Sequence, residues 1–239
     1  MDDMIRKLNE AVAPGRRTVF FGGAGVSTES GLPDFRSAGG IYGKQYHHPP
    51  EVMVSHSFFR SHPEEFFDFY RREMVCPEAR PNAAHRKLAQ MEAEGRLTAV
   101  ITQNIDGLHQ AAGSRRVLEL HGSIHRNRCM DCGKQYGLEA VLNGAGVPRC
   151  SCGGIIKPEV VLYEEELDSR VLNEAVRAIS RADTLIIGGT SLAVYPAAGL
   201  VRYFEGDRLV VINLSPTSMD SRADLLIRGK IGEVLARVE

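Results

Sequence analysis

Short, almost wholly apolar runs alternate along the chain with segments whose apolar residues recur at helical spacing. The first run, Thr18 to Phe21, is followed by five others, each bounded by glycine or polar residues. Runs of this kind predict strands that are buried on both faces of a sheet. The five later runs are Leu97 to Thr102, Val117 to Leu120, Thr184 to Ile187, Leu209 to Asn213 and Leu225 to Ile227.

Four segments with helical spacing are separated by these runs. One precedes the first run, with Met4, Ile5, Leu8 and Val12 on one side, and the others are Asn82 to Glu94, a stripe from Val171 to Ile179 after the N-cap Asp168, and Lys230 to Val238. Strands that alternate with helices predict an α/β fold, a Rossmann-like parallel sheet with helices on both faces. Ligand groups are expected at the carboxyl ends of its strands.

Two segments break this alternation. Residues 37–81 are rich in aromatic residues, histidine and proline and carry a helical pattern over Glu64 to Met74, whereas residues 122–157 carry two pairs of cysteines. We therefore expect one domain over 1–239, with a large part formed by 1–36, 82–121 and 158–239. A smaller part would combine a helical lobe (37–81) with a zinc-ribbon insert (122–157).

Composition excludes several classes of protein. The chain of 239 residues has a formal net charge of −1, and its basic residues are not clustered, so neither a nucleic acid nor a membrane is an expected partner. The N-terminal segment lacks the apolar centre of a signal peptide, and no run is long enough to span a bilayer. We expect a cytoplasmic protein that acts as a monomer.

Four of the five cysteines predict a metal site. Cys129 and Cys132 are followed, after a segment of zinc-ribbon length, by Cys150 and Cys152, and glycines follow each pair. Four thiolates in two tight turns suit tetrahedral Zn²⁺ and leave no open position for water, so the metal is expected to be structural. Cys76 stands apart and is interpreted as an ordinary thiol.

Several predicted strands end in small or hydrogen-bonding residues. The glycines after the first run resemble a dinucleotide loop, but the third glycine and the later acidic residue of a dehydrogenase are missing. A helix N-cap alone explains Asp106 but not Gln103 and Asn104, which favours a binding role. His121 on its own is more often structural, and its polar neighbours favour a catalytic role.

The motifs taken together resemble those of the sirtuins, NAD-dependent protein lysine deacylases, in the bacterial type with a short catalytic core. The resemblance covers about Gly22 to Ile231. Its motifs, in chain order, are Gly23-Ala24-Gly25-Val26-Ser27, Ser30-Gly31-Leu32-Pro33-Asp34-Phe35-Arg36, Thr102-Gln103-Asn104-Ile105-Asp106, Leu108-His109, His121-Gly122, the cysteine pairs, Gly189-Thr190-Ser191 and Asn213.

This resemblance implies a reaction in which the acyl-lysine carbonyl oxygen attacks the anomeric carbon of the nicotinamide ribose of NAD⁺. Nicotinamide leaves, and His121 acts as the general base for the transfer of the acyl group to the 2'-oxygen. The products are nicotinamide, free lysine and 2'-O-acyl-ADP-ribose, or 2'-O-acetyl-ADP-ribose when the lysine is acetylated. The resemblance further implies that NAD⁺ is a co-substrate, that one structural Zn²⁺ is bound per chain, and that the partners are acetylated lysine proteins or peptides.

The resemblance also assigns residues to these roles. His121 and Asn104 are the catalytic pair and also contact the cofactor, beside Gln103, Ile105 and Asp106 at the nicotinamide. The phosphate and ribose cradle and its flap would consist of Gly23, Ala24, Gly25, Ser27, Thr28, Asp34, Phe35 and Arg36. The adenosine half would use Gly189, Thr190, Ser191, Asn213, Leu214, Ser215 and the backbone near Lys230 and Ile231. The substrate peptide would lie between Val160, Val161, Leu162 and Tyr163 on one side and Val194 on the other.

Acyl preference is read from the helical lobe. Sirtuins that remove succinyl or malonyl groups carry Tyr-x-x-Arg there, whereas this chain has Tyr70 followed by Glu73, and Phe69 precedes Arg72. We expect acetyl or another short neutral acyl group, with Arg71 and Arg72 on a solvated helix face. The alternatives are a desuccinylase or demalonylase, a mono-ADP-ribosyltransferase, and a zinc-ribbon binding module without catalysis.

Overall fold

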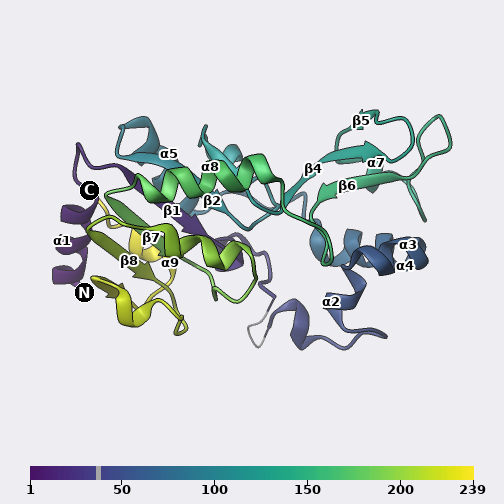
Figure 1. The fold of residues 1–239 in the computed structure, drawn as a ribbon. Coiled ribbons are helices and arrows are strands. Elements are labelled where there is room, and N and C mark those ends of the chain that lie inside the picture. The colour runs from purple at the N-terminus through teal and green to yellow at the C-terminus, as the bar shows by residue number, and fades with distance from the viewer. Residues whose placement is uncertain (36–38) are drawn as a thin grey trace.

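Six parallel strands form the sheet of the large part of the molecule (Figure 1). The computed structural model describes residues 1–35 and 39–239. All six predicted strands are confirmed, and their order in the sheet is β3-β2-β1-β7-β8-β9. Their bounds are β1 Thr18–Gly22, β2 Leu97–Thr102, β3 Val117–Glu119, β7 Thr184–Gly188, β8 Arg208–Ile212 and β9 Leu225–Ile227.

The strand order reverses beside β1. From β1 the chain moves outward to β2 and β3 and then returns to β7 on the other side of β1, with Gly22 aligned on Gly188. In a doubly wound sheet this reversal opens a crevice at the carboxyl ends of the two central strands. The loops that follow β1 and β7 therefore lie side by side at the place where a ligand is expected.

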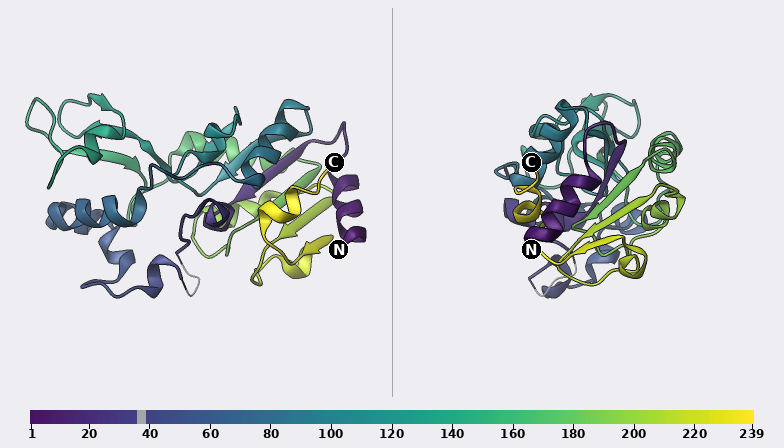
Figure 2. Two further views of the ribbon diagram at one scale, coloured as in Figure 1. Left: turned by 180° about the vertical axis from the view of Figure 1, so that it is seen from behind. Right: turned by 90° about the vertical axis from the view of Figure 1, so that its left-hand side faces the viewer.

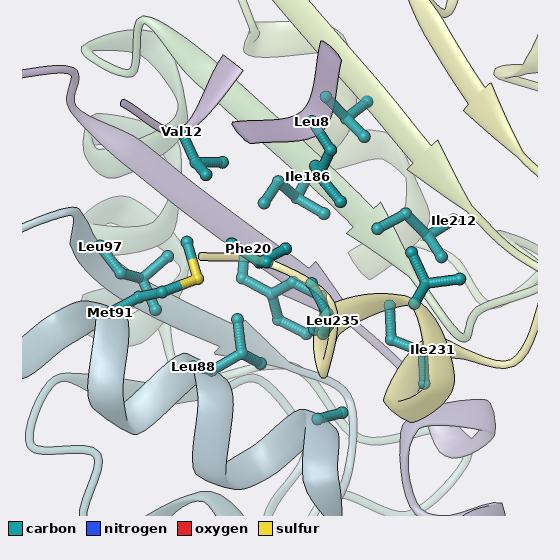
Figure 3. Packing of buried hydrophobic residues seen from close by; sticks show 14 of the residues in the cluster. Leu8, Val12, Phe20, Leu88, Met91, Leu97, Ile186, Ile212, Ile231 and Leu235 are labelled. Carbon is teal, nitrogen blue, oxygen red and sulfur yellow. The ribbon is translucent and has the colours of Figure 1, made fainter. Parts of the chain in front are cut away.

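Helices cover both faces of the sheet, as the sequence pattern predicts. α1 (Asp2–Ala11), α5 (Ala83–Ala93) and α9 (Ile231–Leu235) cover one face, and α8 (Ser169–Ser180) and the 3₁₀ segment Ala197–Tyr203 cover the other. Alternate residues of β1 point to opposite faces, so Phe20 joins the first core and Phe21 the second. Figure 3 shows the Phe20 ring among residues of α5 and α9. Burial of such a side chain contributes roughly 2–3 kcal/mol.

Side chains cap the first turns of α8 and α5. The Asp168 carboxylate accepts hydrogen bonds from the backbone of Arg170 (2.8 Å) and Val171 (3.3 Å), which confirms the predicted N-cap of α8. Asn82 caps α5 by accepting from Ala84 N at 2.9 Å. A cap of this kind contributes about 1 kcal/mol. None of the helices within the described ranges is long and apolar enough to cross a membrane.

The smaller part lies beyond one end of the sheet and combines two units (Figure 2). One is an antiparallel sheet of β5 (Gln135–Tyr136), β4 (Gly122–Cys129) and β6 (Ile156–Val160) with the short helix α7 (Glu139–Leu142). The other contains α2 (Pro50–Met53), α3 (His56–Ser61) and α4 (Pro63–Phe69), which continues as a π-helical turn over Tyr70–Met74. The two units share one core, in which Phe59, Phe66 and Phe67 pack with Ile124 and Val160.

Strands β4 and β6 have no counterpart among the predicted runs. β6 begins inside the segment assigned to the insert and ends beyond residue 158, so the proposed boundary at 157/158 falls within one strand. The last helix is also shorter than predicted: the sequence pattern covers Lys230 to Val238, whereas α9 covers Ile231–Leu235.

The expected solvated face at Arg71 and Arg72 is correct only in part. Arg72 is exposed and pairs with Glu73 at 2.9 Å. Arg71 is the exception: its side chain is 16% exposed and donates to the backbone carbonyls of Val141 (2.7 Å) and Gly146 (2.6 Å). Carbonyls at a helix C-terminus have no partner within the helix, and the guanidinium satisfies the one at the end of α7. Arg71 therefore joins the helical lobe to the zinc-ribbon insert (122–157).

The four predicted cysteine ligands come together. Their sulfur atoms all lie within 4.8 Å of one another, with 3.5 Å between Cys129 and Cys152 and 3.6 Å between Cys132 and Cys150. A tetrahedral zinc site with Zn–S bonds of about 2.3 Å requires sulfur separations of about 3.8 Å. The Tyr136 hydroxyl donates to Cys150 Sγ at 2.9 Å, an outer contact typical of metal ligands. The donor set fits one structural zinc ion.

Two buried histidines pack ring against ring inside the large part. His85 and His109 are 0% and 1% exposed, and their ring centroids lie 4.7 Å apart. His85 Nδ1 accepts from the backbone of Asn82 at 3.2 Å, so this ring is neutral with its proton on Nε2. Burial lowers the pKa of His85 to about 4 and that of His109 to about 3. Both rings are therefore neutral in the folded protein at pH 7.

Loss of one cysteine should release the metal. Cys150→Ser is expected to reduce bound zinc from about one ion per chain to a small fraction of that, because three ligands hold zinc far less tightly than four. Metal analysis and limited proteolysis within residues 122–157 measure the effect, with the exposed Cys76→Ser as the matched control. A metal-free Cys150→Ser protein that resists proteolysis as the unaltered protein does would contradict the assignment.

The buried histidines should make the fold sensitive to acid. Because their pKa values are depressed in the folded state, the unfolded chain binds more protons below about pH 6.5, and stability falls as pH falls. The free energy of unfolding should be lower at pH 5 than at pH 7 by roughly 2 kcal/mol for each histidine. Urea titrations measure it. His109→Phe should remove about half of this loss of unfolding free energy, whereas the exposed-site control His47→Gln should leave the loss unchanged. If the free energy of unfolding fell equally with pH in the two variants, the assignment would be refuted.

Candidate functional site

The loops after β1 and β7 touch through their backbones. The Gly25 N–H donates to the Gly189 carbonyl at 2.8 Å, and a Cβ placed on Gly25 would lie 2.8 Å from that same oxygen. Gly189 has φ +58°, and its Cβ would lie 2.5 Å from Val26 N. Only glycine fits either position. The resulting loop offers backbone N–H groups at the switch point without a third glycine, and such a cradle fits a pyrophosphate.

A polar cluster from the loop after β2 meets the first loop. Asn104 Nδ2 donates to Ser27 Oγ at 3.0 Å, and the Ser27 hydroxyl donates to Asp106 Oδ2 at 2.7 Å. The other Asp106 oxygen accepts from Leu108 N at 2.9 Å. One Asp106 oxygen therefore stabilises the turn at Leu108, and the other fixes the cluster that faces the pocket.

His121 is held in a single tautomer. Its Nδ1 lies 2.9 Å from the Gln103 carbonyl oxygen, which can only accept, so Nδ1 carries the proton and Nε2 keeps its lone pair. Burial lowers the pKa of His121, and the hydrogen bond to Gln103 opposes that shift only in part. The imidazole is neutral near pH 7, which is the state that a general base needs. The Gln103 side chain in turn donates to Thr190 Oγ1 at 3.0 Å, linking the ends of β2 and β7.

One pocket collects most of the predicted nicotinamide and peptide residues. It is lined by the cluster just described, by His121 at the end of the β3 segment, and by the residues that follow β6. The predicted residues on its wall are Ala24, Ser27, Phe35, Gln103, Asn104, Ile105, Asp106, His121, Val160, Val161, Leu162, Tyr163 and Val194.

The predicted adenosine-side residues lie on loops at the same edge of the sheet but outside this pocket wall. They follow β7 and β8 or lie at the start of α9. Ile231 is 3% exposed and its side chain packs in the core, so only its backbone can face a ligand, while Lys230 pairs with Glu233 at 3.0 Å. The other predicted residues that the pocket does not include are Gly23, Gly25, Thr28, Asp34, Gly189, Thr190, Ser191, Asn213, Leu214 and Ser215. Arg36 lies outside the described residues.

The helical lobe supplies pocket residues that sequence reasoning did not assign. These residues are Val54, Tyr70, Glu73 and Met74. Glu164 and Glu165, which end the segment expected to border the peptide, also line the pocket. Tyr70 and Glu73 lie where the Tyr-x-x-Arg motif was sought, but no motif or period marks Val54 or Met74. The aromatic richness of residues 58–70 indicates a core rather than a pocket.

A cofactor with phosphates, a ribose and an amide suits this arrangement. Backbone N–H groups of the glycine loop could donate to phosphate oxygens, the Ser27–Asn104–Asp106 cluster offers hydroxyl, amide and carboxylate groups, and His121 lines the same pocket as that cluster. The zinc ligands lie in the smaller part and are absent from the pocket wall as the described residues define it. The metal site and the pocket are thus separate.

Comparison with known proteins identifies the family. A model of the Sir2 family matches residues 23–196. A protein named NAD-dependent protein deacetylase from Clostridium acetobutylicum is 58% identical over 240 residues, covering 99% of this chain and 98% of that protein. One of the same name from Cutibacterium acnes is 60% identical over 224 residues, covering 93% and 92%.

Solved structures agree. A Sir2 variant with a deacetylated p53 peptide and 3'-O-acetyl ADP-ribose matches with a TM-score of 0.90 at 41% identity, covering 98% of this chain and 96% of that one. Sir2 with a p53 peptide and NAD⁺ matches with a TM-score of 0.85 at 40% identity, with the same coverage. The glycine loop, the oriented His121 and the four cysteines thus occur in a chain that belongs to the Sir2 family, the sirtuins.

Proposed function

We propose that this sirtuin is an NAD-dependent protein lysine deacetylase. The observation that carries the proposal is the neutral His121, with a free Nε2, in the same pocket as the Ser27–Asn104–Asp106 cluster and the extended segment after β6. The names of its relatives support the same activity. Bound NAD⁺ supplies an anomeric carbon that the acyl oxygen can attack and a nicotinamide that can leave.

Each polar group of the pocket has a separate task. Asn104 and Asp106, fixed through Ser27, hold the nicotinamide ribose and the amide. His121 Nε2 accepts a proton from the ribose hydroxyls, and the Gln103 carbonyl keeps Nδ1 protonated and stabilises the imidazolium that forms. Phe35 covers the reacting carbon and excludes water and free nicotinamide. Asn213 and the loops after β7 and β8 hold the adenosine half.

Two walls would hold the acyl-lysine peptide. The Val160–Tyr163 segment, called here the β6 wall, is tied to the fold through Val161 N to His121 O and Tyr163 N to Val54 O, both 3.0 Å. Val194 lines the pocket from the segment after β7. A peptide that adds between them as a strand binds mainly through its main chain, so selection of its side chains is weak.

One assay separates this function from the alternatives. Incubation with NAD⁺ and an acetyl-lysine peptide should give equal amounts of nicotinamide, free lysine and 2'-O-acetyl-ADP-ribose by mass spectrometry. Nicotinamide release without acyl-lysine, together with ADP-ribose mass on a protein, would instead identify a mono-ADP-ribosyltransferase. If the zinc-loaded protein consumed no NAD⁺, the result would favour the remaining alternative, a zinc-ribbon binding module without catalysis.

Removal of the base should abolish product formation. His121→Ala is expected to lower turnover of the acetyl peptide at least about 100-fold, because a positioned general base contributes about 10² to 10⁴. The melting temperature should stay close to that of the unaltered protein, and the exposed-site variant His47→Ala should keep its turnover. Turnover of His121→Ala within a few-fold of the unaltered protein would remove the assigned role.

Acetyl peptides should be preferred to succinyl peptides. Among the described residues on the pocket wall there is no lysine or arginine, and the one acidic side chain from the helical lobe is Glu73. A succinyl carboxylate would be buried without a cationic partner, so its kcat/KM should be at least about tenfold lower than that of acetyl. Peptides that differ only in the acyl group, including propionyl and butyryl, measure this preference, and equal values for acetyl and succinyl would contradict it.

A further inference from the structure

Two residues beside the proposed peptide site have an unusual backbone conformation, and one of them, Glu164, lines the pocket. Among residues 1–35 and 39–239, the non-glycine residues with positive φ are Glu164 (75°) and Leu192 (53°). Side chains other than glycine rarely adopt this region, and such residues concentrate at ligand clamps and active sites. Glu164 directly follows the β6 wall, and Leu192 precedes Val194 on the opposite wall. Each wall of the proposed peptide site is therefore flanked by one such turn.

The side chain of Glu164 stabilises the positive-φ turn by accepting two hydrogen bonds. Its Oε2 accepts from Ser57 N at 2.8 Å, and its Oε1 accepts from Ser57 Oγ at 2.9 Å. Ser57 belongs to α3 of the helical lobe, 107 residues earlier in the chain. Glycine would adopt the same φ without strain. What glutamate adds at this position is the pair of hydrogen bonds to α3, which we call the Glu164–Ser57 clamp.

Contacts of the next residue, Glu165, also join the β6 wall to α3. Glu165 accepts from His56 Nδ1 at 2.9 Å, from Lys157 Nζ at 3.1 Å and from Leu162 N at 2.9 Å. Burial raises the pKa of Glu165, but these hydrogen bonds and the charge of Lys157 outweigh it and lower the pKa overall. The backbone also bonds directly, from His56 N to Tyr163 O at 2.9 Å. The end of the β6 wall is thus fastened to α3 and to β6 itself.

We propose that Glu164 is a positioning residue for the acyl-lysine peptide, because its clamp on Ser57 fixes the end of the β6 wall relative to the opposite wall at Val194. The inference rests on the proposed function. A peptide strand that lies between two walls pairs with both backbones only when their separation is fixed in advance. Glu164 does not act on the reacting atoms, so its loss should weaken peptide binding and leave the chemical step unchanged.

The test compares Glu164→Gly with Glu166→Gln in the zinc-loaded protein. Glycine removes the clamp and relieves the backbone. Glu166 is exposed like Glu164 but lies two positions away and outside the pocket wall. Glu164→Gly should raise KM for the acetyl peptide about tenfold, as expected for two lost charge-assisted hydrogen bonds, with kcat and KM for NAD⁺ within about twofold. Glu166→Gln should match the unaltered protein in all three constants.

Two further measurements separate positioning from general damage. Without any ligand, amide hydrogen exchange at Leu162 and Tyr163 should become faster in Glu164→Gly than in Glu166→Gln. Glu164→Ala, which loses the clamp and keeps the unfavourable φ, should melt about 2–4 °C below Glu164→Gly while showing the same rise in peptide KM.

The outcomes distinguish a failure of the proposed positioning role of Glu164 from a failure of the proposed deacetylase function. An unchanged peptide KM in Glu164→Gly, in a protein that deacetylates normally, would overturn the positioning role and leave the proposed function intact. An equal fall in kcat and kcat/KM would overturn it too, by placing Glu164 in the chemical step. A failure of the proposed function would already appear in the unaltered protein, as the lack of NAD⁺-dependent deacetylation.

Discussion

The contact between the backbones of Gly25 and Gly189 is the constraint on which the site depends. It joins the loops after β1 and β7 at the point where the strand order reverses, and the 2.8 Å hydrogen bond leaves no room for a side chain on either residue. Because β1 lies between β2 and β7, the same contact sets where Ser27 meets Asn104 and where Gln103 meets Thr190. Enlarging either glycine would separate the loops and dismantle both polar links together.

The smaller part provides the other half of the pocket and depends on contacts that bridge its two units. Phe59, Phe66 and Phe67 pack with residues of β4 and β6, and Arg71 donates hydrogen bonds to two backbone carbonyls of the zinc-ribbon insert. The zinc ligands do not reach the pocket, yet they order the sheet whose strand β6 runs into its wall. The metal therefore supports the site through packing, since the four sulfurs close its coordination shell.

Burial and hydrogen bonding divide the histidines by function. His121 is buried enough to be neutral, but one nitrogen stays free because the Gln103 carbonyl binds only the other. His85 and His109 are buried more deeply and lie against each other within the fold, away from the pocket wall. The same physical effect, desolvation of the charged form, thus gives a base at pH 7 in one place and an acid-sensitive core in the other.

The sequence by itself determined the six parallel strands, the cap of α8, the cysteine ligand set and the polar residues at the strand ends, because each has a local signal. Buried parallel strands are continuously apolar, caps have fixed offsets, and ligand spacing is short. Only the tertiary structure decided that β4 pairs with β6, that Arg71 is partly buried and hydrogen-bonded to Gly146, that the helical lobe supplies Tyr70, Glu73 and Met74 to the pocket, and that Glu164 accepts hydrogen bonds from Ser57. These features join residues from about 30 to more than 100 positions apart, and no periodicity within either segment records a contact whose energy exists only after both segments have packed.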